Sequence, residues 1–228
     1  MVTPHPLDNS ILNQLHLNIL PNATSQAFLC CAALPFFNTG GWYLAGGTAL
    51  ALQAGHRRSV DLDFFTAKKT FNEKQAAEYL SRQGDWKTTS LDCGTLYGKL
   101  AGAKISLISY PFFKPSQPLL SVGSIRVLTL PDIAAMKIVA ISQRGRKRDF
   151  IDIYWLATHG QGLEQSIKAA LRQYNVSQNL SHILKSLVYF NDADNDPMPS
   201  LFFKTNWKTV KQYLRREVTK TAKKLLKL

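Results

Sequence analysis

The sequence predicts an α+β protein, with a small mixed sheet and flanking helices in the first half of the chain and helices alone in the second. Two kinds of strand signal, apolar runs between glycine pairs and strict alternation of polar and apolar residues, lie before residue 125. Apolar residues at helical spacing dominate from residue 131 onward. We therefore expect two domains, residues 1–125 and residues 126–228.

The first segments alternate between helix and strand. Residues 8–34 carry apolar side chains at helical spacing, with an interruption near Pro21. The run GGWYLAGG, residues 40–47, is typical of a buried strand with a tight turn at either end. Residues 48–54 are rich in the helix formers Ala, Leu and Gln, and we expect Gly55 to end that helix.

Further strand signals follow. The segment SVDLDFF, residues 59–65, alternates strictly, which predicts a strand with Val60 on the apolar face and the two aspartates on the opposite face. An amphipathic helix is expected over residues 72–83. Strands joined by glycine turns are expected over residues 85–112.

The second half of the chain has the pattern of a series of helices. They are expected over residues 131–144, 148–160 and 163–174, around residues 180–190, and in a basic segment at the C-terminus. The basic face of the last helix is either solvated or in contact with an RNA backbone. Its apolar stripe is needed for packing, so we expect no membrane partner.

Composition indicates a globular protein of the reducing cytoplasm. Hydrophobic residues make up 45% and aromatic residues 11% of the chain, which is typical of folded rather than disordered proteins. No apolar run approaches the length of about 18 residues that a membrane-spanning helix needs, and the N-terminus lacks the pattern of a signal peptide. The three cysteines form neither a disulfide framework nor a metal-binding spacing.

The net charge indicates an anionic partner. The chain has 28 Lys and Arg residues against 15 Asp and Glu residues, which gives a net charge of +13. Such an excess favours polyanions such as nucleic acids, nucleotides or an anionic membrane surface. It carries no information about the fold.

Two aspartates, Asp61 and Asp63, share one face of the expected strand, with Cα atoms about 6–7 Å apart. Two such charges repel each other unless a cation lies between them. Mg²⁺, or Mn²⁺ in its place, suits this position because it accepts one or two carboxylates and completes its coordination with water and phosphate oxygens. The alternative is a solvated edge strand.

The glycine turn ahead of these aspartates suits phosphate groups. Gly46 and Gly47 leave backbone N–H groups accessible at the start of a helix, whose dipole favours anions. Thr48 offers a hydroxyl for capping the helix or for a phosphate oxygen. Each feature alone is common at helix entries. The order of strand, glycine turn, helix, basic segment and D-x-D strand is more specific and indicates a metal–nucleotide site.

These motifs resemble those of the nucleotidyltransferase superfamily with the polymerase-β-like fold, in which a glycine turn precedes D-x-D on the next strand. The blocks LAGGTALAL…HRRSVDLDFF and AAMKIVAISQRGRKRDFIDIYWL are similar to AbiEii/AbiGii-type nucleotidyltransferase toxins, over roughly residues 40–160. The resemblance implies a cytoplasmic bacterial enzyme that transfers a nucleotidyl group from an NTP with Mg²⁺. It also implies the toxin of a toxin–antitoxin or phage-defence pair, with an antitoxin protein as partner and tRNA as an acceptor.

The second block contributes Lys137 and Asp152. Lys137 borders an apolar helix face, which its stem could simply cover; the resemblance makes it a phosphate-binding lysine. Asp149 is expected to be structural, complementing the helix dipole or pairing with Arg148, whereas the resemblance makes Asp152 an active-site carboxylate. The basic residues at 144–148 form either a solvated turn or a contact with phosphates or RNA. We expect the site to lie between the two halves.

Two further features concern the expected reaction. Arg57 or Arg58 could stabilise charge on the transferring phosphate, the alternative being a salt bridge, and His56 is expected to be a packing residue. Many nucleotidyltransferases of this fold carry a third carboxylate on the strand that corresponds to KISLISY, near Ser106, and this chain has none there. Either Asp152 takes over that role, or the enzyme is slow or inactive.

The expected reaction is a metal-assisted in-line displacement that moves a nucleotidyl group from an NTP to an acceptor hydroxyl, with RNA as the main candidate acceptor. Two alternatives remain open. The acceptor could be a protein hydroxyl or a small molecule, which would leave the net charge of +13 without a purpose. The chain could also be a catalytically inactive member of the fold that binds nucleic acid.

Overall fold

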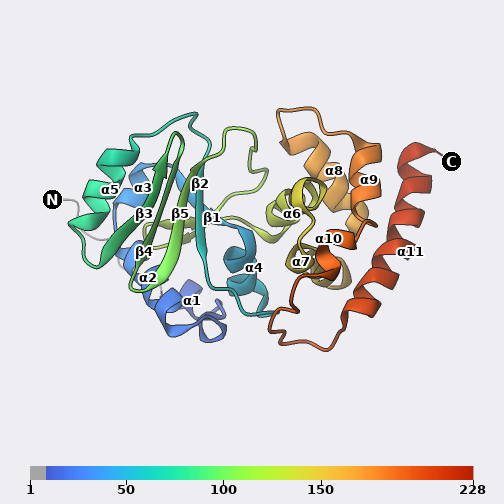
Figure 1. Ribbon diagram of the computed structural model, residues 1–228, viewed down its shortest axis with the longest axis horizontal. Coiled ribbons are helices and arrows are strands. Elements are labelled where there is room, and N and C mark those ends of the chain that lie inside the picture. Colours follow the sequence, from blue (N-terminus) through green and yellow to red (C-terminus); the bar gives the residue numbers. More distant parts are fainter. Residues whose placement is uncertain (1–8, 228) are drawn as a thin grey trace. The chain divides into compact units, whose positions relative to one another are not determined.

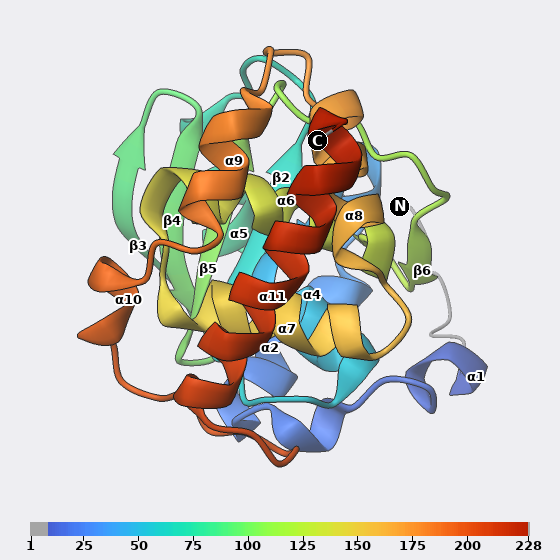
Figure 2. The same ribbon diagram turned by 90° about the vertical axis from the view of Figure 1, so that its right-hand side faces the viewer.

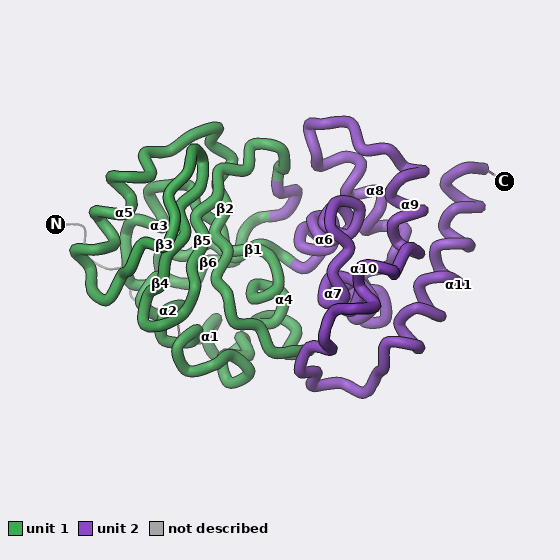
Figure 3. Tube along the Cα trace, viewed as in Figure 1, with its two compact units in different colours: residues 1–114, 118–129 green, residues 115–117, 130–228 purple. Residues whose placement is uncertain are grey.

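The computed structural model describes residues 9–227, which form two compact units (Figures 1 and 3). Unit 1 consists of residues up to 114 together with residues 118–129. Unit 2 consists of residues 115–117 together with those from 130 onward. Every strand in the described part of the chain belongs to unit 1, and the structure of unit 2 is helical. The predicted α+β class, with a helical C-terminal half, is confirmed.

Unit 1 is built on a mixed seven-stranded sheet with the order β3-β4-β5-β2-β1-β7-β6. β1 pairs in parallel with β7 and β2 in parallel with β5, while the other neighbouring strands are antiparallel. The strands are β1 (Trp42–Ala45), β2 (Leu62–Thr66), β3 (Trp86–Asp92), β4 (Thr95–Leu100), β5 (Ala103–Ser109), β6 (Leu120–Val122) and β7 (Ile125–Val127).

Helices flank this sheet. α2 packs against β5, α3 against β1 and β7, α4 against β1 and β2, and α5 against β3 and β4. Large apolar side chains from the sheet and the helices fill the space between them, among them Phe28, Phe37 and Phe64, all fully buried. The helices are α1 (Asn9–Leu12), the 3₁₀ helix η1 (Leu17–Ile19), α2 (Asn22–Ala33), α3 (Phe36–Thr39), α4 (Gly46–Ala54) and α5 (Glu73–Ser81).

Local sequence explains where several of these elements begin and end. The side chain of Asn72 caps α5 by accepting a hydrogen bond of 2.9 Å from the backbone N–H of Gln75. Gly55 ends α4 with a φ of +64°, in the left-handed region that glycine adopts without strain. The strand expected in GGWYLAGG, the helix expected over residues 72–83 and the strands expected over residues 85–112 are confirmed.

Three expectations for unit 1 need correction. The interruption expected near Pro21 is present, with α2 beginning at Asn22, but the part before it forms two short helices, α1 and η1, rather than one. β2 begins at Leu62, and Val60 is 49% exposed instead of buried, because the chain reaches the sheet only after Asp61. A domain boundary after residue 125 would cut β7, whose pairing with β1 extends the sheet to Val127, so the compact units divide after residue 129.

Unit 2 is a bundle in which α6 contacts α7, α8 and α9, and α11 packs on α7 and α8 (Figure 2). Apolar side chains from these helices, such as Ile138, Phe150 and Leu214, are buried between them. None of the helices in the described part of the chain is long and apolar enough to span a membrane. The helices are α6 (Leu130–Arg144), α7 (Lys147–Thr158), α8 (Leu163–Gln173), α9 (Leu180–Ser186), α10 (Asn191–Asp194) and α11 (Trp207–Leu226).

A buried carboxylate explains why residues 115–117 belong to unit 2. Asp132, in the first turn of α6, has no exposed surface. Its oxygens accept hydrogen bonds from the backbone N–H groups of Ser116 and Gln117 at 3.0 and 3.2 Å, and from the Ser116 hydroxyl at 2.6 Å. Gln173 of α8 donates a further bond at 2.8 Å. The charge of Asp132 is thus satisfied by donors from two other segments of the unit, residues 115–117 and α8.

Candidate functional site

The glycine turn brings the start of α4 against the second aspartate. Gly46 follows β1 with a φ of +72°, a conformation that favours glycine. Ala45, directly before it, is paired with Asp63 across β1 and β2. A Cβ atom on Gly46 would lie 3.3 Å from Oδ2 of Asp63. Glycine therefore serves two purposes here, because it permits both the turn and the close approach of the Asp63 carboxylate.

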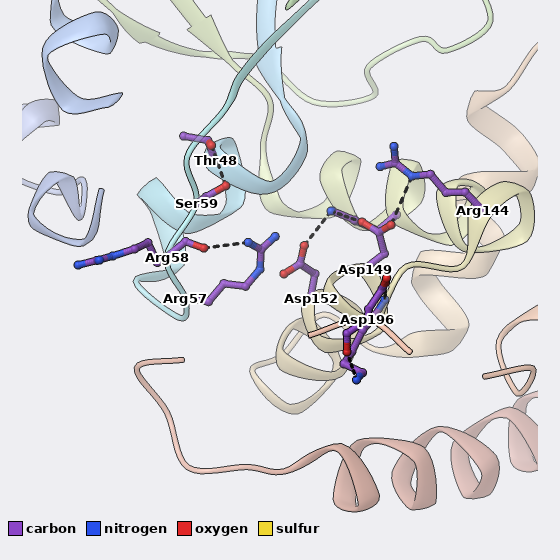
Figure 4. Close-up of polar contacts among 10 residues, drawn as sticks. Thr48, Arg57, Arg58, Ser59, Arg144, Asp149, Asp152 and Asp196 are labelled. Atoms are coloured by element: carbon purple, nitrogen blue, oxygen red, sulfur yellow. Dashed lines mark hydrogen bonds and ion pairs between the residues drawn. The ribbon is translucent and has the colours of Figure 1, made fainter. Parts of the chain in front are cut away.

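Gly47 makes room for a buried arginine. A Cβ atom at this position would lie only 2.6 Å from Nη2 of Arg57 and 3.2 Å from Oγ of Ser59. Arg57 is 3% exposed, and its Nη1 donates a hydrogen bond of 3.0 Å to the backbone carbonyl of Arg58 (Figure 4). The guanidinium group is thereby held beside the first turn of α4. Of the two candidate arginines, the structure places Arg57 at the turn and leaves Arg58 exposed.

We expect Gly47→Ala to displace the Arg57 guanidinium, because no rotation of a methyl group relieves a contact of 2.6 Å. Overpacking of this kind lowers the free energy of unfolding by about 1–3 kcal/mol. Urea denaturation measures the loss, and the m-value should not change because the same surface is exposed on unfolding. A variant as stable as the parent protein would show that Arg57 is not confined at this position.

Thr48 is a positioning residue in this structure. It is 1% exposed, and its Oγ1 lies 2.8 Å from Oγ of Ser59 (Figure 4). It also donates a hydrogen bond to the backbone carbonyl of Asp61. The hydroxyl neither caps α4 nor faces solvent. It ties the first turn of α4 to the segment that leads into β2, and so holds the backbone that carries Asp61.

The two aspartates lie at the start of β2 and are half-buried. Asp61 directly precedes the strand, and Asp63 is in register with Ser106 of β5. The hydroxyl of Ser106 donates a hydrogen bond of 2.9 Å to Oδ1 of Asp63. A serine thus occupies the position at which a third carboxylate was sought, and it orients Asp63. Sequence reasoning noted the missing acid but not this bond.

The donor set suits a hard divalent cation. Carboxylate oxygens are the ligands that Mg²⁺ prefers, and it takes one or two of them when phosphates and water supply the rest. Among residues 9–227 there is no group of three or more His, Cys, Asp or Glu side chains placed to hold a metal ion. The residues present therefore fit a metal that Asp61 and Asp63 hold jointly with a nucleotide, rather than one that the protein encloses by itself.

A second charged cluster, within unit 2, joins α6 to α7. Nζ of Lys137 lies 2.6 Å from Oδ1 of Asp149 and 2.8 Å from Oδ2 of Asp152, and both carboxylate side chains are fully buried. Nε of Arg144 lies 3.5 Å from Oδ2 of Asp149 (Figure 4). Lys137 is 4% exposed, so it does not extend its charge into water. Asp149 lies in the first turn of α7, as one of the two alternatives expected, but the pairing with Arg148 is wrong; its ion-pair partners are Lys137 and Arg144.

Of the basic residues at 144–148, Lys147 is buried, whereas Arg144, Arg146 and Arg148 are exposed. Arg146 forms an ion pair of 2.6 Å with Asp196. Lys147 is buried, its Nζ donates to the backbone carbonyls of Asp194 and Asp196, and it lies 5.4 Å from the centre of the Trp207 ring. Hydrogen bonds from Lys211, which has the largest effect, and from Trp207 lower the pKa of the Asp194 carboxyl. The segment is thus partly held by the protein, while its three arginines remain exposed to solvent or to an anionic partner.

α11 is docked through an apolar stripe and presents a basic face. Val210, Leu214, Val218 and Thr221 are buried. The exposed basic side chains on and beside the helix are Lys204, Lys208, Arg215, Arg216, Lys220, Lys223, Lys224 and Lys227. The predicted docking by an apolar stripe is confirmed, and the basic face remains available to solvent or to an anionic partner.

The chain matches a known protein family over both of its blocks of sequence motifs. Residues 28–86 and 107–226 match the model of the family described as "Nucleotidyl transferase AbiEii toxin, Type IV TA system". The chain is also 38% identical over 187 residues to the "Uncharacterized protein aq_aa25" of Aquifex aeolicus (strain VF5), with 78% of this chain and 86% of that protein covered.

Two solved structures share the fold at low sequence identity. The structure of MenT4, a nucleotidyltransferase toxin from Mycobacterium tuberculosis H37Rv, aligns with a TM-score of 0.53 and 12% identity, covering 95% of this chain and 90% of that one. JHP933 from Helicobacter pylori aligns with a TM-score of 0.50 and 16% identity, covering 97% of this chain and 95% of that one. These alignments span both units.

Proposed function

The chain belongs to the AbiEii family of nucleotidyl transferase toxins of type IV toxin–antitoxin systems, and we propose that it moves a nucleoside monophosphate from an NTP to a hydroxyl group of RNA, with tRNA as the expected acceptor. The observation that carries the proposal is the packing of the Gly46–Gly47 turn against Asp63, which joins a helix N-terminus to a half-buried carboxylate pair. A phosphate chain and its metal ion need these two features side by side.

The residues of unit 1 hold the nucleotide in this proposal. Asp61 and Asp63 bind Mg²⁺, or Mn²⁺ in its place, and the bound metal supplies positive charge to the phosphate oxygens. The backbone N–H groups at Gly46 and Gly47 donate to phosphate oxygens, favoured by the dipole of α4. Arg57, fixed beside this turn, adds a positive charge that opposes the charge developing on the transferring phosphate.

Lys137 and Asp152 take part in the same reaction. The acceptor hydroxyl forms a bond to the α-phosphorus, the bond to the β-phosphate oxygen breaks, and pyrophosphate leaves. Asp152 accepts the proton of the hydroxyl, which the missing carboxylate near Ser106 cannot do. Lys137 neutralises triphosphate charge. Because it is bound to two carboxylates, a phosphate oxygen must replace at least one of these partners before Lys137 can contact it.

RNA is the favoured acceptor because of charge. A net charge of +13 favours a polyanion, whereas a protein or small-molecule acceptor would not require it. A protein antitoxin as the cognate partner, and a role in phage defence, belong to the same proposal through the family. A catalytically inactive nucleic-acid-binding protein is the second candidate, favoured by the serine in place of a third carboxylate.

Incubation of the protein with each of the four labelled NTPs, Mg²⁺ and total RNA tests the proposal. We expect label to enter an RNA band with one or more of the NTPs, and transfer to stop when EDTA removes the metal. Label found in the protein itself, or in a small molecule, would show that this molecule and not RNA is the acceptor. Binding of NTP with no transfer to any acceptor would favour the inactive alternative.

We expect Asp152→Asn to retain the fold and NTP binding but to lose most of the transfer rate, by about 10²–10⁴-fold, because general-base catalysis contributes that much. Asp149→Asn is the matched control, since it makes the same isosteric change in the same cluster. Both variants should lose similar stability in a thermal melt. Equal losses of rate in the two variants would identify Asp152 as a structural residue.

A further inference from the structure

Three lysines lie in register across neighbouring strands of unit 1. Lys87 of β3 is paired with Lys99 of β4, and Lys99 is paired with Lys104 of β5. All three side chains are exposed. Neighbouring strands lie about 4.8 Å apart, and like charges directly opposite each other destabilise a sheet. A row of this kind works against folding unless it has a partner.

Little within the protein offsets this repulsion. Among the described residues, one ion pair involves a lysine of the row. Nζ of Lys87 lies 3.8 Å from Oδ1 of Asp85, and both side chains are largely exposed. An exposed pair at this distance contributes little. The other two lysines of the row, Lys99 and Lys104, have no ion-pair partner in the part of the chain that the structure covers.

The row shares a face of the sheet with the candidate metal ligands. Lys104 and Ser106 are two residues apart on β5 and so lie on the same face, and Ser106 is in register with Asp63. Along β5 the intervening residues are buried, and α2 packs against this strand while α5 packs against β3 and β4 (Figure 1). The helices therefore cover the apolar face and leave the lysine face open.

An exposed aromatic side chain completes this surface. Tyr97 of β4 is 39% exposed and is in register with Ser106, so it lies on the lysine face. It is two strands away from Asp63, which corresponds to about 10 Å. Basic side chains along a sheet with an aromatic ring among them form the usual platform for single-stranded nucleic acid, because phosphates contact the cations while an unpaired base stacks on the ring.

We propose that Lys87, Lys99, Lys104 and Tyr97 form the surface that binds the acceptor, an unpaired end of an RNA strand, and lead it to the aspartates. This inference rests on the proposed function, since it names the place at which the RNA acceptor of that reaction binds. Unpaired RNA fits better than a duplex, because a base within a duplex is stacked on its neighbours and cannot stack on Tyr97.

Binding of a fluorescent single-stranded RNA oligonucleotide by the full chain, measured over a range of salt concentrations, tests the surface. The variant Lys99→Gln/Lys104→Gln should bind about 10- to 30-fold more weakly, and the slope of log K against log salt should become shallower by about 1.4. Its melting temperature should hold or rise, because repulsion within the row is relieved. Tyr97→Ala should weaken binding about 5- to 150-fold, and Tyr97→Phe should not.

The matched control is Lys69→Gln/Lys74→Gln, which removes the same net charge at two exposed lysines outside the row. It should bind RNA as the parent protein does. Equally weakened RNA binding in both double variants would contradict the proposed surface, as would equal affinity for a duplex of the same sequence. If the parent protein binds the strand through this row but transfers no nucleotide to RNA, the surface stands and the proposed function fails. If nucleotide is transferred to RNA but the row is not needed for RNA binding, the proposed function stands and the surface fails.

Discussion

Replacing Asp63 with asparagine is expected to lower nucleotidyl transfer by about 10²–10⁴-fold, which corresponds to the several kcal/mol of charge stabilisation that a bound metal supplies. Asp61→Asn should have a comparable effect. Neither change should unfold the protein, because both side chains are half-buried and asparagine keeps the oxygen that accepts the bond from Ser106. Asparagine is nearly isosteric with aspartate, so the melting temperature in EDTA should change little.

The matched control for this pair is Asp92→Asn, an exposed aspartate at the end of β3. It loses the same charge in the same unit, so a general electrostatic effect on RNA binding would appear in all three variants. Initial rates with a labelled NTP, alongside thermal melts in EDTA, measure both quantities. Transfer at the parent rate in either the Asp61 or the Asp63 variant would show that this aspartate does not bind a metal ion that transfer requires.

Lys137→Ala is expected to cause the largest loss of stability, about 3–5 kcal/mol, because it leaves Asp149 and Asp152 buried without their shared counter-ion. For a chain of this length that loss corresponds to a fall in melting temperature of about 6–20 °C. Urea denaturation at neutral pH measures it. A decrease below about 1 kcal/mol would mean that solvent reaches the two carboxylates, contrary to their burial.

A compensated variant separates the burial of charge from the loss of the lysine itself. Lys137→Ala combined with Asp149→Asn and Asp152→Asn no longer buries an unpaired charge, so it should recover part of the stability that Lys137→Ala alone loses. If the triple variant is less stable than Lys137→Ala, packing rather than charge governs this cluster. Activity of Lys137→Ala is informative only at temperatures where the variant is shown to be folded.

Local patterns were sufficient for the elements of the proposed nucleotide site. Glycine pairs around a short apolar run predicted β1, alternation predicted β2, and the position of Gly55 predicted the end of α4, because each depends on residues close together in the chain. The D-x-D spacing predicted that Asp61 and Asp63 share one face of the strand; the structure places Asp63 in β2 and Asp61 directly before it.

The contacts around these elements depend on tertiary packing, which periodicity does not describe. Helical spacing placed Lys137 at the edge of an apolar face, but only the packing of α6 on α7 shows that Asp149 and Asp152 enclose its ammonium group. Neighbours in sequence suggested Arg148 as the partner of Asp149, whereas Arg144, one helix earlier, takes that place. The lysine row of β3, β4 and β5 likewise depends on strand register, which three separate segments determine together.

The position of the labelled phosphate in the NTP tests the central claim most directly, namely that the chain transfers a nucleotidyl group to RNA. Parallel reactions of the parent protein with RNA and Mg²⁺ would use the same NTP labelled either at the α-phosphate or at the γ-phosphate. We predict that α-label enters RNA, that γ-label is released as pyrophosphate, and that Asp63→Asn abolishes both. Entry of γ-label into RNA, or release of α-label as free nucleotide with none in RNA, would contradict the claim.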